Sequence, residues 1–159
     1  MRYFLFLLLC SLCSIVLHAE TNSYADKSVL SSGNVVKIRV SENGIHSIPY
    51  DTLKAWGLQP DAVRIMGYGG GMLSENFTLN KWDDLPSVAF YMHKGADGVF
   101  NSGDYILFYA QGAVKWEYVN NKWHHTTNTY SKYGYYFVSD NTGEQRIIQE
   151  AAAVSTQDL

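Results

Sequence analysis

One stretch, residues 97–112 (DGVFNSGDYILFYAQG), constrains the fold more than any other part of the chain. It opens with turn formers, Asp97-Gly98 and then Asn, Ser, Gly and Asp at residues 101–104. Glycine tolerates positive φ, and Asn or Asp side chains bond the backbone just ahead of them. Residues 105–109 then join three aromatic and two aliphatic side chains without a polar break. So continuous a run predicts a strand that is covered on both faces in the middle of the core.

The rest of the chain has the composition of a β protein. It holds 12 Tyr, 7 Phe and 4 Trp with 13 Gly and only 3 Pro, and aromatic residues suit a pleated, half-buried surface. Further strands are predicted at residues 35–40, 45–48, 63–68, 88–92, 115–119, 122–127 and 133–138, with one more candidate at 146–149. Residues 35–40 and 63–68 are predicted to alternate between the two faces of their strands. These short strands, separated by turn residues, predict an all-β fold, an antiparallel β-sandwich of jelly-roll type.

Local signals add detail to this sandwich. Asn43-Gly44 predicts a type I′ turn that pairs the first two strands, and Asn120-Asn121 predicts a second hairpin. Residues 49–57 are the one good helix candidate, with proline in the first turn and Gly57 at the C′ position. The three glycines at residues 69–71 lack the residues of a phosphate loop and predict a tight corner where backbones approach closely.

The N-terminus is predicted to be an export signal. Arg2 precedes an apolar run at residues 3–17, and Ala19 is a small residue before a cut at Glu20. This run is too short for a convincing membrane span. We therefore expect residues 1–19 to be the signal peptide, 20–32 a leader, 33–149 the sandwich and 150–159 a linker or a truncated end.

Removal of residues 1–19 would take away both cysteines and one basic residue. The mature chain would have no disulfide, no thiolate ligand and no cysteine nucleophile. Its balance would be 11 basic against 15 acidic side chains, or −4, without a basic cluster. Nucleic acid and anionic membrane surfaces are therefore poor candidates as partners.

Two sets of residues suggest a bound ligand. Asp97, Asn101 and Asp104 could hold calcium, although the spacing is not that of an EF-hand and capping of the turn is the favoured interpretation. Trp82, Trp116, Tyr118 and Trp123 could stack on carbohydrate, although packing in the core and at its rim is favoured. His124-His125 is a poor zinc site, because neighbours on a strand point to opposite faces.

Several segments together resemble one family. They are residues 34–58 (NVVKIRVSENGIHSIPYDTLKAWGL), 63–77 (VRIMGYGGGMLSENF), 83–86 (DDLP), 97–118 (DGVFNSGDYILFYAQGAVKWEY) and 130–140 (YSKYGYYFVSD). In this order they are similar to the N-terminal region of the type IX secretion system sortases, which are gingipain-type cysteine peptidases. The resemblance covers about residues 29–148.

The resemblance implies a function for a longer protein. In that family a caspase-like catalytic domain with a His–Cys dyad follows this region, and the protein acts at the cell-surface side of the outer membrane. It removes C-terminal signal domains from secreted cargo. No catalytic residue can be carried over, because the mature part of this chain contains no cysteine.

What the resemblance implies for this chain is a non-catalytic N-terminal domain. Its expected partners are the catalytic domain of the same protein and other type IX components, and its expected docking surface includes Met72, Leu73, Phe77 and Trp82. The alternative is a free-standing secreted module that binds carbohydrate or calcium.

Overall fold

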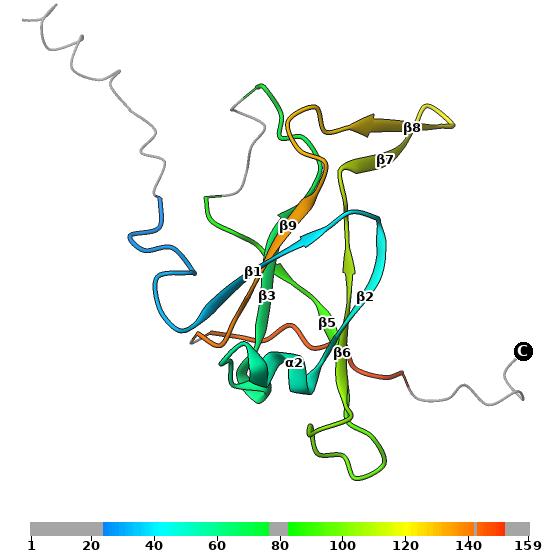
Figure 1. Cartoon of the computed structure of the whole chain (residues 1–159). Helices are drawn as coiled ribbons and strands as arrows, with labels where there is room; N and C mark the ends of the chain where they lie inside the picture. The colour runs from blue at the N-terminus through cyan, green and yellow to red at the C-terminus, as the bar shows by residue number, and fades with distance from the viewer. Residues whose placement is uncertain (1–23, 77–82, 142, 152–159) are drawn as a thin grey trace, which may run out of the picture.

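The computed structural model describes residues 24–76, 83–141 and 143–151. Within these ranges the strands form two antiparallel sheets and a separate hairpin (Figure 1). The first sheet has the order β1-β9-β3-β4, from β1 (Val35–Val40), β9 (Gly134–Ser139), β3 (Arg64–Gly69) and β4 (Ser87–Val88). The second has the order β2-β6-β5, from β2 (Gly44–Pro49), β6 (Tyr105–Ala110) and β5 (Phe90–His93). The hairpin consists of β7 (Val114–Val119) and β8 (Lys122–Thr127). The predicted all-β antiparallel sandwich is confirmed.

The two sheets share one hydrophobic core. Ile65 and Val138 of the first sheet and Phe90 and Ile106 of the second are all fully buried in the same cluster. Full burial of a side chain of this size stabilises the fold by about 1.5–3 kcal/mol. The Phe108 ring of β6 meets the Tyr136 ring of β9 edge-on, with centroids 5.7 Å apart. Contact between side chains of both sheets is what makes the fold a sandwich.

The helix α2 (Tyr50–Ala55) closes one end of the core, where Leu53 is fully buried. It ends as its sequence predicts, because Gly57 adopts φ +76°. The Gly57 N–H donates to the Lys54 carbonyl at 2.9 Å, and the Leu58 N–H donates to the Leu53 carbonyl at 3.1 Å. These two bonds form a Schellman motif. A single 3-10 turn, η1 (Pro60–Ala62), then leads into β3.

The predicted hairpin at Asn43-Gly44 is wrong. β1 pairs with β9 and β2 pairs with β6, so the chain passes from one sheet to the other at this point. The Asn43 side chain instead accepts from the Gly112 N–H at 2.7 Å and donates to the Val114 carbonyl at 2.8 Å. Tertiary bonds therefore use the side chain that the local pattern assigned to a turn.

The second predicted hairpin is confirmed. β7 and β8 pair from Val114–Thr127 to Val119–Lys122. Asn120 and Asn121 adopt φ of 52° and 60°, as a type I′ turn requires.

The strand at residues 105–110 is central in its sheet, but the prediction that it is covered on both faces is wrong. Ile106, Phe108 and Ala110 are buried, whereas Tyr109 is 55% exposed. β6 therefore alternates like a half-buried strand, and its outer face lacks a covering layer among the described residues.

Three smaller predictions also differ from the structure. The strand expected at residues 88–92 is divided at Ala89 into β4 and β5, which belong to different sheets. β3 does not alternate, because Ile65, Met66 and Gly67 are buried in succession and its register shifts between Met66 and Gly69. Residues 146–149 form no strand, only a parallel bridge between Ile147 and Phe90.

Candidate functional site

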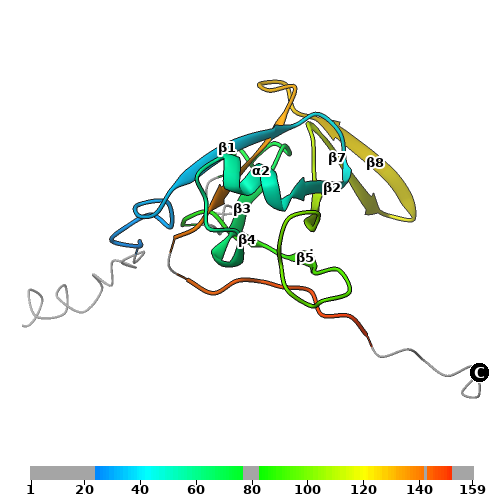
Figure 2. The same ribbon diagram turned by 60° about the horizontal axis from the view of Figure 1, so that its bottom comes forward.

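The β7–β8 hairpin projects beyond the two sheets (Figures 1 and 2). All six residues of β8 and five of the six in β7 are exposed. The cross-strand pairs Trp116–His125 and Tyr118–Trp123 are two residues apart, so their side chains lie on the same face. The hairpin therefore has one aromatic face.

The rings on this face are close together but uncovered. The ring centroids are 5.0 Å apart for Trp116 and His125 and 5.2 Å apart for Tyr118 and Trp123. Trp116 is 55%, Tyr118 58% and Trp123 67% exposed. The opposite face carries an exposed ion pair, in which Lys115 Nζ lies 2.6 Å from Glu117 Oε1. The favoured interpretation of these aromatic residues is packing in the core and at its rim, and the three residues that the structure describes are not in the core; Trp82 lies outside the described residues.

An amphipathic hairpin of this kind is typical of an interface. A two-stranded hairpin alone has marginal stability in water. Aromatic side chains bury more area than most others when they are covered, and Trp and Tyr are enriched at interfaces. We call the face formed by Trp116, Tyr118, Trp123 and His125 the aromatic face.

The base of the hairpin rests on three glycines, which we call the glycine corner: Gly70, Gly112 and Gly134. A Cβ on Gly70 would lie 2.2 Å from the Gly112 carbonyl oxygen, and one on Gly112 would lie 2.4 Å from the Ser41 carbonyl oxygen. A Cβ on Gly134 would lie 2.1 Å from the Gln111 carbonyl oxygen. The predicted close approach of backbones near residues 69–71 is confirmed.

Hydrogen bonds fix the hairpin to this corner. The Gly70 N–H donates to the Gln111 carbonyl at 3.0 Å. The Asn128 N–H donates to the Ala113 carbonyl at 2.8 Å, and its side-chain amide donates to the Gly70 carbonyl at 2.9 Å. The orientation of the aromatic face is thus set by the core rather than by the hairpin itself.

Tyr136 connects the corner to the interior. Its hydroxyl oxygen accepts from the Gln111 N–H at 2.7 Å. Burial raises the pKa of Tyr136 above its usual value, and this outweighs the Gln111 N–H, which lowers it. The hydroxyl is therefore neutral at neutral pH.

A hollow of about 390 Å³ lies beside the corner, between residues 68–75 and the segment after β8. Met72, Leu73 and Tyr130 line it, and Leu73 is 62% exposed. The Thr129 hydroxyl lies 3.8 Å from the Met72 sulfur. Two residues of the predicted docking surface are therefore next to the base of the aromatic hairpin; Phe77 and Trp82 lie outside the described residues.

The turn before β6 brings the three predicted calcium ligands together, bonded to one another. Asp97 accepts from the Val99 N–H at 3.0 Å and from the Asn101 side-chain amide at 2.8 Å, and Asp104 accepts from the Asn101 N–H at 2.8 Å. The Val99 N–H and the Asn101 amide hold the pKa of Asp97 below its usual value. These are the bonds of a capped turn, and a calcium site remains a prediction. In the part of the chain that the structure describes, no three His, Cys, Asp or Glu side chains are placed to share a metal.

The sequence did not reveal a second exposed apolar surface, on the outer face of the β2-β6-β5 sheet. Ile45 is 67%, Tyr109 55% and Ile148 51% exposed, and together with Leu107 and Tyr91 they line an open groove of about 480 Å³. The sequence hides this surface, because the continuous apolar run at residues 105–109 predicts a strand that is covered on both faces. The hydroxyls of Tyr105 and Tyr109, which prefer water, were the signal available in the sequence.

Among the described residues no helix is long and apolar enough to cross a membrane. Comparison with protein-family models gives no match, and comparison with curated proteins gives none either.

The chain is similar to a solved structure, the crystal structure of dimeric latent PorU from Porphyromonas gingivalis. The identity is 36% and the TM-score 0.67, over 81% of this chain and 11% of the PorU chain. This chain thus spans about a tenth of the length of PorU. The resemblance to a type IX secretion sortase that the sequence predicted is confirmed: in sequence and in fold this chain is similar to a part of PorU, and the share covered is consistent with an N-terminal region.

Proposed function

We propose that this chain is the non-catalytic N-terminal domain of a type IX secretion sortase and packs on the caspase-like catalytic domain of the same protein. The observation that carries the proposal is the likeness to PorU in both sequence and fold. The whole protein would remove C-terminal signal domains from secreted cargo. The domain alone is expected to have no peptidase activity, because residues 20–159 contain no cysteine.

The aromatic face and the adjacent Met72–Leu73 hollow are the proposed contact with the catalytic domain. Trp116, Tyr118 and Trp123 are each more than half exposed, and covering the exposed part of one ring would contribute about 2 kcal/mol before the costs of association. Because the glycine corner fixes the hairpin to the core, the face is pre-organised for binding.

The proposal also covers how the domain affects the catalytic domain and where in the cell the protein acts. The similar PorU structure is of a latent form. A domain that packs on a catalytic domain can support its folding or restrict access to it. We expect the protein to be exported and to work at the cell-surface side of the outer membrane with other type IX components.

The test is a binding measurement between this chain and PorU from which the matching region has been removed. Calorimetry of the unchanged chain, of Trp123→Ala and of Tyr24→Ala would be compared. Tyr24 is 70% exposed in the leader and serves as the matched control. Trp123→Ala is expected to weaken binding by about tenfold or more, as loss of an aromatic anchor does, and Tyr24→Ala to leave it unchanged. Absence of a complex would refute the proposal, and equal affinity of the two variants would remove the aromatic face from the contact.

A free-standing carbohydrate- or calcium-binding module is the second candidate, because exposed aromatic rings also stack on sugars. A module of that kind would bind neutral oligosaccharides or melt at a higher temperature in millimolar calcium. If Asp97→Asn removed such a calcium effect, the second candidate would be favoured over docking.

A further inference from the structure

The outer edge of β5, opposite β6, is covered only in part by the segment of chain that follows β9. Residues 145–150, which we call the strap, run alongside it in an extended conformation. The Phe90 N–H donates to the Arg146 carbonyl at 2.9 Å, and the Ile148 N–H donates to the Phe90 carbonyl at 2.8 Å. The strap therefore pairs with β5 in parallel around Phe90 and Ile147.

The backbone pairing between β5 and the strap stops after Phe90 and does not reach Met92. In antiparallel sheets, alternate residues direct both backbone groups to the same edge. Because Phe90 directs its N–H and carbonyl to the strap, Met92 does the same. The next bonds of a parallel ladder would join Met92 to Ile148 and Glu150, and the structure records neither. Met92 is only 8% exposed, and unpaired backbone groups at such a position cost free energy.

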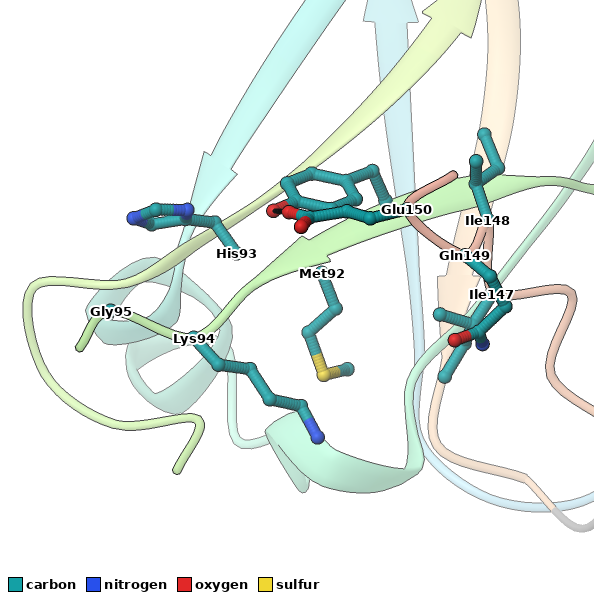
Figure 3. A pocket seen from close by; sticks show the side chains of 9 residues that line it. Met92, His93, Lys94, Gly95, Ile147, Ile148, Gln149 and Glu150 are labelled. Carbon is teal, nitrogen blue, oxygen red and sulfur yellow. Dashed lines mark hydrogen bonds between the residues drawn. The ribbon is translucent and has the colours of Figure 1, made fainter. Parts of the chain in front are cut away.

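A cavity of about 480 Å³ lies where the ladder stops, between Met92–Gly95 and the end of the strap (Figure 3). The Lys94 side chain extends at one side of it. At the end of the strap, the Glu150 carboxylate accepts from the Tyr91 hydroxyl. Among the described residues the structure records one ion pair, between Lys115 and Glu117 on the hairpin. The Lys94 ammonium therefore forms no ion pair with a described carboxylate.

The cavity adjoins the apolar groove on the outer face of the sheet, because Tyr91 and Ile148 line both. Leu107 extends the groove across β6. A polypeptide strand at this edge would thus meet the backbone groups of Met92, which no recorded bond uses, and an apolar surface on one side. At the end it would meet the Lys94 ammonium, while the Glu150 carboxylate accepts from the Tyr91 hydroxyl.

We propose that the edge of β5 binds an extended acidic peptide, parallel to β5, by strand addition. The peptide backbone pairs with the N–H and carbonyl of Met92. Its apolar side chains lie in the groove beside Leu107 and Ile148, and an acidic side chain meets Lys94. Main-chain bonds would supply affinity, and the groove and the lysine would supply specificity. The proposal does not depend on the proposed docking of a catalytic domain.

The test uses two capped hexapeptides, one alternating valine with aspartate and one alternating valine with lysine. Amide exchange and chemical shifts of the chain are followed by NMR with and without peptide. Without peptide, the Met92 amide should exchange faster than the amides of Tyr91 and His93, which face β6. With the acidic peptide, exchange at Met92 should slow by about tenfold or more, as it does when an amide joins a ladder.

Charge reversal tests the specificity. Lys94→Glu should weaken the acidic peptide by about tenfold and improve the lysine peptide, whereas Lys122→Glu on the hairpin should change neither affinity. Protection of Met92 without peptide would overturn the proposal, because the strap itself would then occupy the edge. Failure of both peptides to bind would also overturn the proposal, because the edge of β5 would then be covered by water alone. If Lys94→Glu left the affinity for the acidic peptide unchanged, the proposed preference for acidic peptides would be overturned.

Discussion

Replacing Gly70 with alanine would force apart the backbones that meet at the glycine corner. The new Cβ would lie 2.2 Å from the Gly112 carbonyl oxygen and 2.5 Å from its carbon, where ordinary contacts begin at 3.4 Å. The two segments would have to separate by about 1 Å, because both atoms belong to the backbone and cannot rotate away.

The cost has two parts. Overpacking of this kind destabilises a core by about 1–3 kcal/mol. Separation would also break the bond from the Gly70 N–H to Gln111 and the bond from the Asn128 amide to the Gly70 carbonyl, at about 1 kcal/mol each. The expected loss in free energy of unfolding is therefore roughly 3–5 kcal/mol, a large part of the roughly 5–15 kcal/mol of a typical domain.

The matched control is Gly98→Ala. Gly98 has φ +70° and no atom within 4 Å of its Cβ position, so alanine there meets only the left-handed backbone penalty of about 1–2 kcal/mol. Urea unfolding followed by tryptophan fluorescence would compare the three proteins, with the slope m checked for constancy. A loss at Gly70 no greater than that at Gly98 would refute the close approach as the reason for glycine at this corner.

Two further predictions concern Tyr136 and the leader. Tyr136→Phe removes the acceptor of the Gln111 N–H and should lower the free energy of unfolding by about 1–3 kcal/mol; no change in urea unfolding would mean that the bond is replaced. Burial raises the pKa of Asp84, but the N–H groups of Leu85 and Val29 and the Ser28 hydroxyl outweigh it and hold the pKa below its usual value. The hydrogen bond from the Val29 N–H of the leader to the Asp84 carboxylate should therefore be fully present above the usual aspartate pKa. It should be lost as the pH falls through the lowered pKa of Asp84, which amide exchange of Val29 measured against pH would report. Constant protection of Val29 down to strongly acid pH would contradict this assignment.

The local signals that predicted the fold correctly act within a few residues. Gly57 ends its helix because only the left-handed conformation completes the Schellman bonds, and Asn120-Asn121 turns its hairpin for a similar reason. Asn43-Gly44 carries an equally good turn signal, yet its side chain bonds Gly112 and Val114 instead. A turn signal shows that the chain can reverse there, and distant partners decide whether it pairs.

For the candidate site, too, the sequence predicts the local features, and the structure decides the features that depend on distant segments. The sequence shows the aromatic residues of the hairpin, and its strand period places Trp116 and Tyr118 on one face. It does not show whether a second layer covers that face, because coverage depends on the positions of other elements. Only the structure shows that these rings are exposed, while Tyr136, another aromatic residue of a predicted strand, is buried.

By itself the sequence determined most of the strands, the one helix, the β7–β8 hairpin, the β class and the resemblance to a type IX sortase, because period, turn chemistry and segment order can be read along the chain. The tertiary structure alone decided how the strands of the two sheets pair, that β6 leaves an open outer face and that the strap stops pairing at Met92. Pairing and burial depend on atoms far apart in the chain, such as Gly70 and Gly112, whose backbones touch only when the whole sandwich has formed.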